Sequence, residues 1–164
     1  MKNTGIYSQT FKGNEMPDYV FGKVFNPKDS VFMSSFGMAW SDSIYGSVGI
    51  VSNTSDLYEW DRALCSNRLV KKKTLDEIFE PFILLNDSSS GYGFGWFIRE
   101  NYRIREADVG KRADHYGIWP GYESSIVRFP DADRTIIILC NQSPSAKDKL
   151  VEDIGEVLFE KDGG

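Results

Sequence analysis

The sequence predicts an α+β fold, in which an antiparallel sheet carries a C-terminal helix and is preceded by a helical, loop-rich region. Three observations in this chain of 164 residues support it. Segments beyond residue 90 show the apolar patterning of β-strands. Two stretches between residues 53 and 82 place apolar residues at helical spacing instead. The closing stretch "SAKDKLVEDIGEVLFE" repeats apolar residues every three to four positions, which is typical of an amphipathic helix.

The first half of the chain is expected to be irregular and then helical. Residues 1–50 are rich in Gly, Ser and Asn, and Pro17 and Pro27 interrupt any long element. In "NTSDLYEWDRAL" one of the first three residues can cap a helix. The apolar face of this helix is expected to consist of Leu57, Trp60 and Leu64.

A second helix is expected to begin at Thr74, because Thr74 and Glu77 have the spacing of a capping box. Pro81 is expected to mark its end. The predicted buried stripe of this helix is Leu75, Ile78, Phe79 and Phe82.

The second half of the chain is expected to form the sheet. The stretch "YGFGWFI" predicts one strand with Tyr92, Phe94 and Trp96 on a single face and glycines on the other. The segments "YESSIVRF" and "RTIIILCN", joined by "PDAD", predict an antiparallel hairpin. The apolar run 136–140 predicts a strand covered on both faces. For the closing helix, Ser145 is the expected cap and the expected buried stripe is Leu150, Ile154, Val157 and Leu158.

Composition narrows the classes of function. A formal net charge of −5 does not favour a nucleic-acid partner, which needs a basic face. No apolar run approaches the ~18 residues of a membrane span. Cys65 and Cys140 with a single histidine make a poor zinc set. Phosphate-binding and dinucleotide-binding glycine patterns are absent from the sequence. We therefore expect neither a metal nor a cofactor.

The most informative stretch is "HYGIWPGYESS", residues 115–125, which contains the only histidine of the chain. A lone histidine is more often structural than catalytic. Here, however, it precedes a glycine and a sharp turn between two predicted strands. The nucleophile-elbow pattern G-x-S-x-G occurs nowhere in the sequence, so an α/β-hydrolase is not indicated.

These residues resemble the third active-site motif of the serine β-lactamase-like and penicillin-binding protein family, in its class C and esterase-like branch. That motif reads K-[ST]-G or H-x-G, followed by glycine, an aromatic residue and serine at the spacing of Gly121, Tyr122 and Ser124. Four further stretches are similar to family motifs in the correct order: "MKNTG", "GSVGIVSNTSDLYEW", "YGFGW" and "RFPDADRTIIILCNQS". The resemblance covers nearly the whole chain and corresponds to the C-terminal portion of the family fold.

The resemblance implies roles for five residues. His115, Gly117 and Ile118 are expected in the catalytic site: the imidazole organises hydrogen bonds, the glycine leaves room for substrate, and the backbone N–H of Ile118 is one of two oxyanion donors. Tyr116 and Trp119 are expected to contact substrate.

The family's S-x-x-K and Y-x-N motifs are not found in the sequence, and in the family they precede the "MKNTG" stretch. We therefore expect residues 1–90 to be the remainder of a helical lobe and residues 91–164 to be the C-terminal part of the sheet lobe. The expected function is the C-terminal portion of a serine hydrolase that cleaves amide or ester bonds by acyl transfer, inactive alone. Two alternatives stay open: a non-catalytic module that binds a peptide or cell-wall fragment, and a degenerate domain whose histidine only braces a loop.

The resemblance also implies the partners and the location. A small-molecule or peptide substrate and a missing N-terminal half are the expected partners, and an extracytoplasmic location is expected. The predicted strand 135–140 would lack its neighbours from the N-terminal part of the family fold. We therefore expect self-association through that sheet edge.

Overall fold

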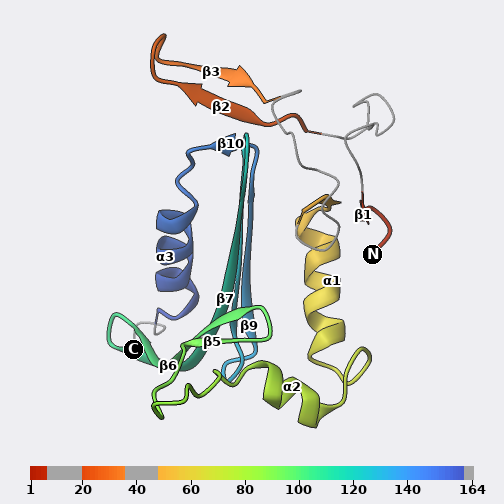
Figure 1. Cartoon of the computed structure of the whole chain (residues 1–164), viewed down its shortest axis with the longest axis vertical. Helices are drawn as coiled ribbons and strands as arrows, with labels where there is room; N and C mark the ends of the chain where they lie inside the picture. Colours follow the sequence, from red (N-terminus) through yellow and green to blue (C-terminus); the bar gives the residue numbers. More distant parts are fainter. Residues whose placement is uncertain (7–19, 36–47, 161–164) are drawn as a thin grey trace.

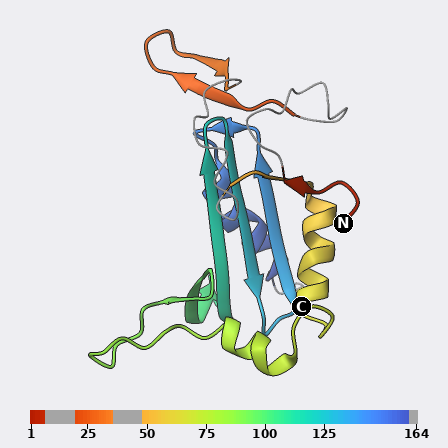
Figure 2. The ribbon, with the colours of Figure 1, turned by 45° about the vertical axis from the view of Figure 1, so that its right-hand side comes forward.

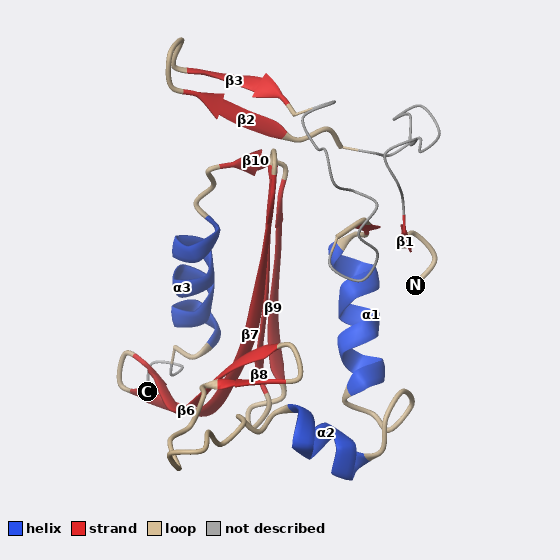
Figure 3. Cartoon of the chain, in the orientation of Figure 1, coloured by secondary structure: helices blue, strands red, loops and turns tan. Residues whose placement is uncertain are grey.

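A computed structural model describes residues 1–6, 20–35 and 48–160 of the chain. Its centre is a five-stranded antiparallel sheet whose strands neighbour one another in chain order. The α+β prediction is therefore confirmed (Figures 1 and 3). The strands of this sheet are β5 (Tyr92–Gly93), β6 (Trp96–Ile104), β7 (Ala107–Trp119), β8 (Tyr122–Phe129) and β9 (Arg134–Cys140).

Helices cover the two faces of this sheet, as Figures 1 and 2 show. On one face lies α3 (Lys147–Leu158) over a core of Val127, Phe129, Ile136, Ile138 and Val151. On the other face lies α1 (Thr54–Leu64), and α2 (Lys72–Ile78) lies near the end of the sheet. Both pack on a second core of Leu64, Phe79, Trp96, Ile98 and Ala113. The long strands β7 and β8 thus carry apolar side chains on both faces.

Helix α1 begins where its sequence indicates. The side chain of Asn53 accepts a hydrogen bond from the backbone N–H of Asp56 at 2.8 Å, so Asn53 is the N-cap. Leu64 is buried and Trp60 packs against the same core, which confirms part of the expected face. The prediction did not include Asp61, which is also buried.

The predicted start of α2 is wrong. The helix begins at Lys72 behind Lys71, whose side chain makes no cap hydrogen bond, so Thr74 is inside the helix. Phe79 is buried directly after the last turn, while Phe82 is 52% exposed. The helix ends at Ile78, three residues before Pro81. The capping pattern at Thr74 therefore does not set the start of this helix.

The stretch "YGFGWFI" forms a hairpin and not one strand. Phe94 and Gly95 both have positive φ angles, of 43° and 89°, and they turn the chain between β5 and β6. Such left-handed pairs form the two-residue turns that match the twist of adjacent strands. Trp96 is buried, whereas Phe94 is exposed and its ring packs on Phe82, with centroids 5.2 Å apart.

The buried stripe of α3 also differs from the prediction. The helix buries Lys147, Val151 and Gly155, and Leu158 packs against the same core. Leu150, Ile154 and Val157 are exposed instead. Ser145 lies one residue before the N-cap Ala146, and its Oγ accepts from the N–H of Lys147 at 3.3 Å.

The opening region contains regular structure that the sequence did not indicate. Strands β2 (Lys23–Asn26) and β3 (Val31–Ser34) form a hairpin, and β2 pairs with β10 (Gln142–Ser143). A short pair joins β1 (Gly5–Ile6) to β4 (Ile50–Val51). The N–H of Lys23 donates to the carbonyl of Asn141 at 2.9 Å, so the β2–β3 hairpin contacts the end of the main sheet. Pro17 lies outside the described residues.

The hairpin of β8 and β9 confirms the "PDAD" prediction. Strand β9 is the last strand of the sheet, and both α1 and α3 contact it. Coverage on both faces is thus partly confirmed, because Leu139 is still 42% exposed. Within the described residues, no helix is both long and apolar enough to cross a membrane.

Candidate active site

The candidate site lies along the last residues of β7, where this strand extends beyond its neighbour β6. The pairing of β6 with β7 ends at Phe97 opposite Asp114. Residues 115–119 pair with β8 alone among the described strands. Among the described residues, one edge of β7 is therefore unpaired over this stretch, and we call it the open edge; an extended ligand could bind to it.

The register of the hairpin indicates which backbone groups face this open edge. Trp119 and Tyr122 are opposite each other across a two-residue turn. A pair that closes such a turn is hydrogen-bonded, and hydrogen-bonded and non-hydrogen-bonded pairs alternate along antiparallel strands. Ile118 opposite Glu123 is then a non-hydrogen-bonded pair. The N–H of Ile118 is accordingly directed away from β8, toward the open edge.

His115 lies at the start of the open edge among aromatic side chains. Its Nε2 is 3.2 Å from the hydroxyl of Tyr92 on β5. Its ring stacks on Phe97, with centroids 5.5 Å apart, and on Tyr116 at 5.9 Å. Because Phe97 also stacks on Tyr116 at 5.8 Å, both neighbouring rings of β7 lean toward the open edge. The imidazole is half-buried and oriented by its neighbours.

Gly117 faces Ser124 across the two strands. A Cβ built on Gly117 would lie 2.6 Å from the Oγ of Ser124, closer than real Cβ contacts. The glycine thus allows the hydroxyl of Ser124 to lie close against β7 beside the open edge. Alternation along β7 places Gly117 and His115 on the same side of the strand as Ala113, which belongs to the core under α1.

The turn at the end of β7 also requires glycine. Gly121 has a φ of +83°, which L side chains rarely adopt, and a Cβ there would lie 2.6 Å from the Cβ of Ser35. The hydroxyl of Tyr122 accepts from the N–H of Gly22 at 2.7 Å. These contacts hold the β2–β3 region against the end of the candidate site.

The structure brings four of the five expected residues into one continuous arrangement. His115 and Tyr116 are in ring contact, and Gly117 and Ile118 follow along the same edge. Trp119 is half-buried at the hairpin end, and no ring contact joins it to His115 in the described part of the chain.

Sequence reasoning missed two residues near the site. Tyr92 was inside the "YGFGW" motif, and Ser124 was counted only in the motif spacing, so neither was assigned a site role. The signal that could have found Tyr92 was its place in a motif of the resembled family. The hydrogen bond to His115 itself joins residues 23 positions apart and leaves no local pattern.

A buried polar cluster supports β7 from the α3 side. The Nζ of Lys147 lies 5.3 Å from the ring centroid of Tyr116, and this lysine is only 4% exposed. Burial alone would raise the pKa of Glu123, but hydrogen bonds from Ser145 and Ser143 keep that pKa below its usual value. These polar contacts stabilise the β7–β8 hairpin on the side of α3, next to the open edge of β7.

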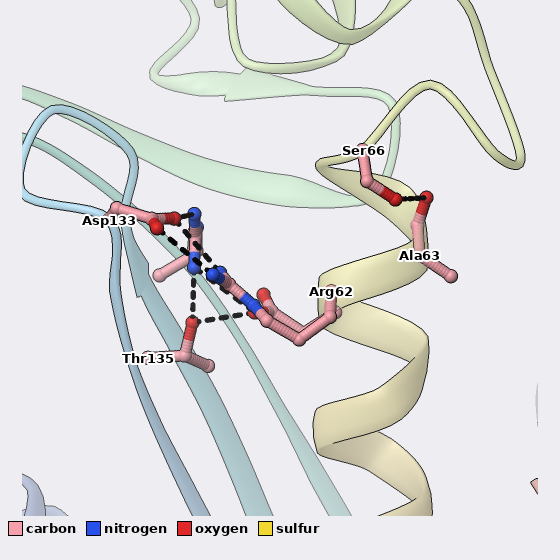
Figure 4. Close-up of polar contacts among 7 residues, drawn as sticks. Arg62, Ala63, Ser66, Asp133 and Thr135 are labelled. Carbon is pink, nitrogen blue, oxygen red and sulfur yellow. Dashed lines mark hydrogen bonds and ion pairs between the residues drawn. The ribbon is translucent and has the colours of Figure 1, made fainter.

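An ionic network fixes α1 against the opposite face of the sheet (Figure 4). Arg128 on β8 donates to the buried carboxylate of Asp61 at 3.1 Å, and Thr135 donates to the same oxygen at 3.0 Å. Arg62 reaches both oxygens of Asp133, each at 3.0 Å. Hydrogen bonds from Arg62 and Arg128 lower the pKa of Asp133 to about 2. Helix α1 is thereby anchored to the strands that follow the site.

The sheet thus lies between α1 and α3, and the H-x-G stretch lies on its strand β7 beside the unpaired edge. Residues 2–159 match the family model described as Beta-lactamase, and the chain belongs to this family. It is 27% identical over 148 residues to penicillin-binding protein 4* of Bacillus subtilis (strain 168), a match that covers 87% of this chain and 32% of that protein.

Two solved structures show the same fold. A penicillin-binding protein from Bacillus halodurans superposes with a TM-score of 0.66 at 16% identity, over 95% of this chain and 44% of that one. The octameric penicillin-binding protein homologue from Pyrococcus abyssi superposes with a TM-score of 0.73 at 18% identity, over 98% of this chain and 35% of that one. The chain therefore spans about a third of the curated relative and less than half of either solved structure.

Proposed function

We propose that this chain forms one wall of the active site of a beta-lactamase-family hydrolase that cleaves amide or ester bonds by acyl transfer. The open edge of β7 is the observation that carries the proposal. Backbone N–H groups directed at a reacting carbonyl stabilise the oxyanion, and loss of one such donor costs about 2.7–4 kcal/mol in related chemistry. Ile118 supplies this donor, Gly117 gives the substrate room, and His115 organises hydrogen bonds beside them.

The nucleophile and its base come from elsewhere in the complete protein. No serine of this sequence is followed by lysine at the third position. Acyl transfer needs a nucleophile activated by a neighbouring base, so the chain alone is expected to be inactive. The division into a helical-lobe remainder at 1–90 and a sheet-lobe portion at 91–164 is part of the same proposal.

A second candidate function uses the same edge. An unpaired strand edge binds an extended peptide through main-chain hydrogen bonds, with side-chain pockets adding specificity. Tyr116 and Trp119 flank the edge and would supply such contacts. A stand-alone module that binds a peptide or cell-wall fragment is therefore the alternative. The proposed partners are a small-molecule or peptide substrate and the missing N-terminal half, in an extracytoplasmic setting.

Amide-resolved NMR tests the binding wall directly. The chain is titrated with benzylpenicillin and, separately, with an acyl-D-alanyl-D-alanine peptide. We expect reversible shifts concentrated at the amides of residues 115–119. In Gly117→Val the new side chain would collide with the hydroxyl of Ser124 beside the edge and force the strand or that side chain to shift, so these shifts are expected to fall about tenfold.

The control variant is Gly155→Ala, which adds a methyl group on α3 against Ile104, away from the edge. It should respond as the wild-type chain does. Shifts in neither titration, or equal shifts in Gly117→Val, would contradict the proposal. Shifts with the peptide alone would favour the peptide-binding module.

A further inference from the structure

We propose that Tyr92 is a positioning residue that holds His115 as the Nδ1–H tautomer, so that the imidazole acts in the site as a hydrogen-bond donor and not as a base. The role of this imidazole in catalysis rests on the proposed function. Its structural content, the tautomer, is independent of any reaction.

Tyr92 is itself held rigidly. Its backbone carbonyl accepts from the N–H of Phe82 at 3.0 Å and from the Oγ of Ser90 at 2.8 Å. Its ring meets Phe97 edge to face, with centroids 4.9 Å apart. The hydroxyl is therefore fixed in place, 3.2 Å from the Nε2 of His115.

The chemistry of the two groups decides the direction of this hydrogen bond. Either atom could donate by geometry alone, because the role of Nε2 depends on the tautomer. A phenol O–H is a far stronger acid than a neutral imidazole N–H, and an unprotonated imidazole nitrogen is a far better acceptor than a phenol oxygen. Tyr92 therefore donates to Nε2. In the neutral imidazole the proton then sits on Nδ1.

In this tautomer, Nδ1 carries the N–H group that the imidazole can offer as a hydrogen-bond donor. Among residues 1–6, 20–35 and 48–160, no hydrogen bond to Nδ1 of His115 is found, so this N–H is available to a ligand. His115 lies at the start of the open edge to which the N–H of Ile118 is also directed. The imidazole then offers an N–H donor near the edge that the backbone N–H of Ile118 faces, which suits a polar group of the substrate. A base at this position would need an unprotonated Nδ1.

Two tyrosines lie beside the imidazole, and the hydrogen bond to His115 distinguishes Tyr92 from Tyr116. Tyr116 also contacts the imidazole, at 5.9 Å between centroids, but among the described residues the hydrogen bond to the imidazole comes from the hydroxyl of Tyr92. Removal of each hydroxyl in turn separates hydrogen bonding from ring packing. Tyr92→Phe removes the bond and keeps the ring, while Tyr116→Phe is the matched control.

The single histidine makes the test direct. Nitrogen-15 NMR of the histidine-labelled chain, above the pH at which the imidazole loses its charge, gives one pair of ring signals. In the wild-type chain we expect Nδ1 to have the shift of a protonated nitrogen and Nε2 that of an unprotonated one. In Tyr92→Phe the two signals should move toward each other, because a released imidazole exchanges between tautomers. Tyr116→Phe should leave both signals unchanged.

Two results would overturn the inference: a wild-type spectrum with the proton on Nε2, or a Tyr92→Phe spectrum identical to the wild-type one. The wild-type spectrum needs no variant, so a folding defect in Tyr92→Phe cannot hide the answer. A confirmed tautomer together with no ligand shifts along residues 115–119 would refute the proposed function alone. Ligand shifts along residues 115–119 together with a proton on Nε2 would refute this inference alone.

Discussion

Asp61 on α1 and Arg128 on β8 form an ion pair at 3.1 Å, and their side chains are only 2% and 3% exposed. The pair lies between helix and sheet, where Thr135 also donates to the carboxylate. The Nε of Arg128 is the buried side-chain nitrogen without a hydrogen-bond partner in the described residues. The guanidinium of Arg128 therefore has one unsatisfied N–H, and Asp61 is its buried ionic partner while Asp133 is its exposed one.

Replacement of Asp61 by alanine should destabilise the fold by about 3–5 kcal/mol, because it removes the buried partner of Arg128 and leaves the exposed Asp133 to pair with the buried guanidinium. Urea unfolding monitored by tryptophan fluorescence measures this loss. The control is Asp76→Ala, which breaks the exposed pair of Lys72 and Asp76. That pair should contribute less than about 1 kcal/mol. Equal effects of the two variants would contradict the role assigned to the buried pair.

The neighbouring Asp133 gives a pH dependence. Arg62 and Arg128 lower its pKa from 3.8 to about 2, so the charged form is favoured in the folded chain. The stability from this depressed pKa is fully present above pH 3.8 and is lost as the pH falls toward 2. The difference in unfolding free energy between the wild-type chain and Asp133→Asn should therefore be larger at pH 6 than at pH 2. An equal difference at both pH values would rule out the ionic contribution.

Gly121 tests the contact between the β2–β3 region and the end of β7. Gly121→Ala places a side chain at a positive φ and against Ser35, which should cost about 1–3 kcal/mol. Gly95→Ala is matched, because φ is +89° there and no atom lies within 4 Å of the new Cβ. Amide hydrogen exchange at Lys23 should accelerate in Gly121→Ala only. Equal protection of this amide in both variants would mean that the turn does not hold β2.

Self-association through the β9 edge is the fourth prediction. Among the described strands β9 pairs only with β8, and Leu139 is 42% exposed. Open apolar edges pair between chains, and an added lysine discourages such pairing. Light scattering should show dimers or larger species for the wild-type chain and a marked shift to monomer for Leu139→Lys. Leu85→Lys, at a fully exposed loop position, should not change the distribution. A wild-type monomer at high concentration would contradict the prediction.

Local signals predicted the parts of the fold that local chemistry determines. A helix cap within residues 53–55 and the hairpin turn "PDAD" depend on a few adjacent residues, and both were visible in the sequence; the structure selects Asn53 as the cap. The buried stripe of α3 was not visible in the sequence, because the structure buries Lys147 against Tyr116 and Gly155 against Ile104. A hydropathy pattern places neither a lysine nor a glycine in a core.

The candidate site shows the same limit. The H-x-G stretch identified His115 and Gly117 by resemblance, yet the open edge depends on where β6 ends relative to β7. The hydroxyl of Tyr92 reaches His115 only because Phe94 and Gly95 turn the chain. Both relations arise from strand register, which single-sequence periodicity does not encode.

On the proposed function, this chain supplies the wall of an acyl-transfer site without its nucleophile. Intact mass spectrometry after incubation with a reactive penicillin tests it most directly. The chain should retain its unmodified mass, because no serine has the lysine that would activate it. A stoichiometric acyl adduct on one serine would contradict the claim, since the chain would then contain a complete nucleophilic site.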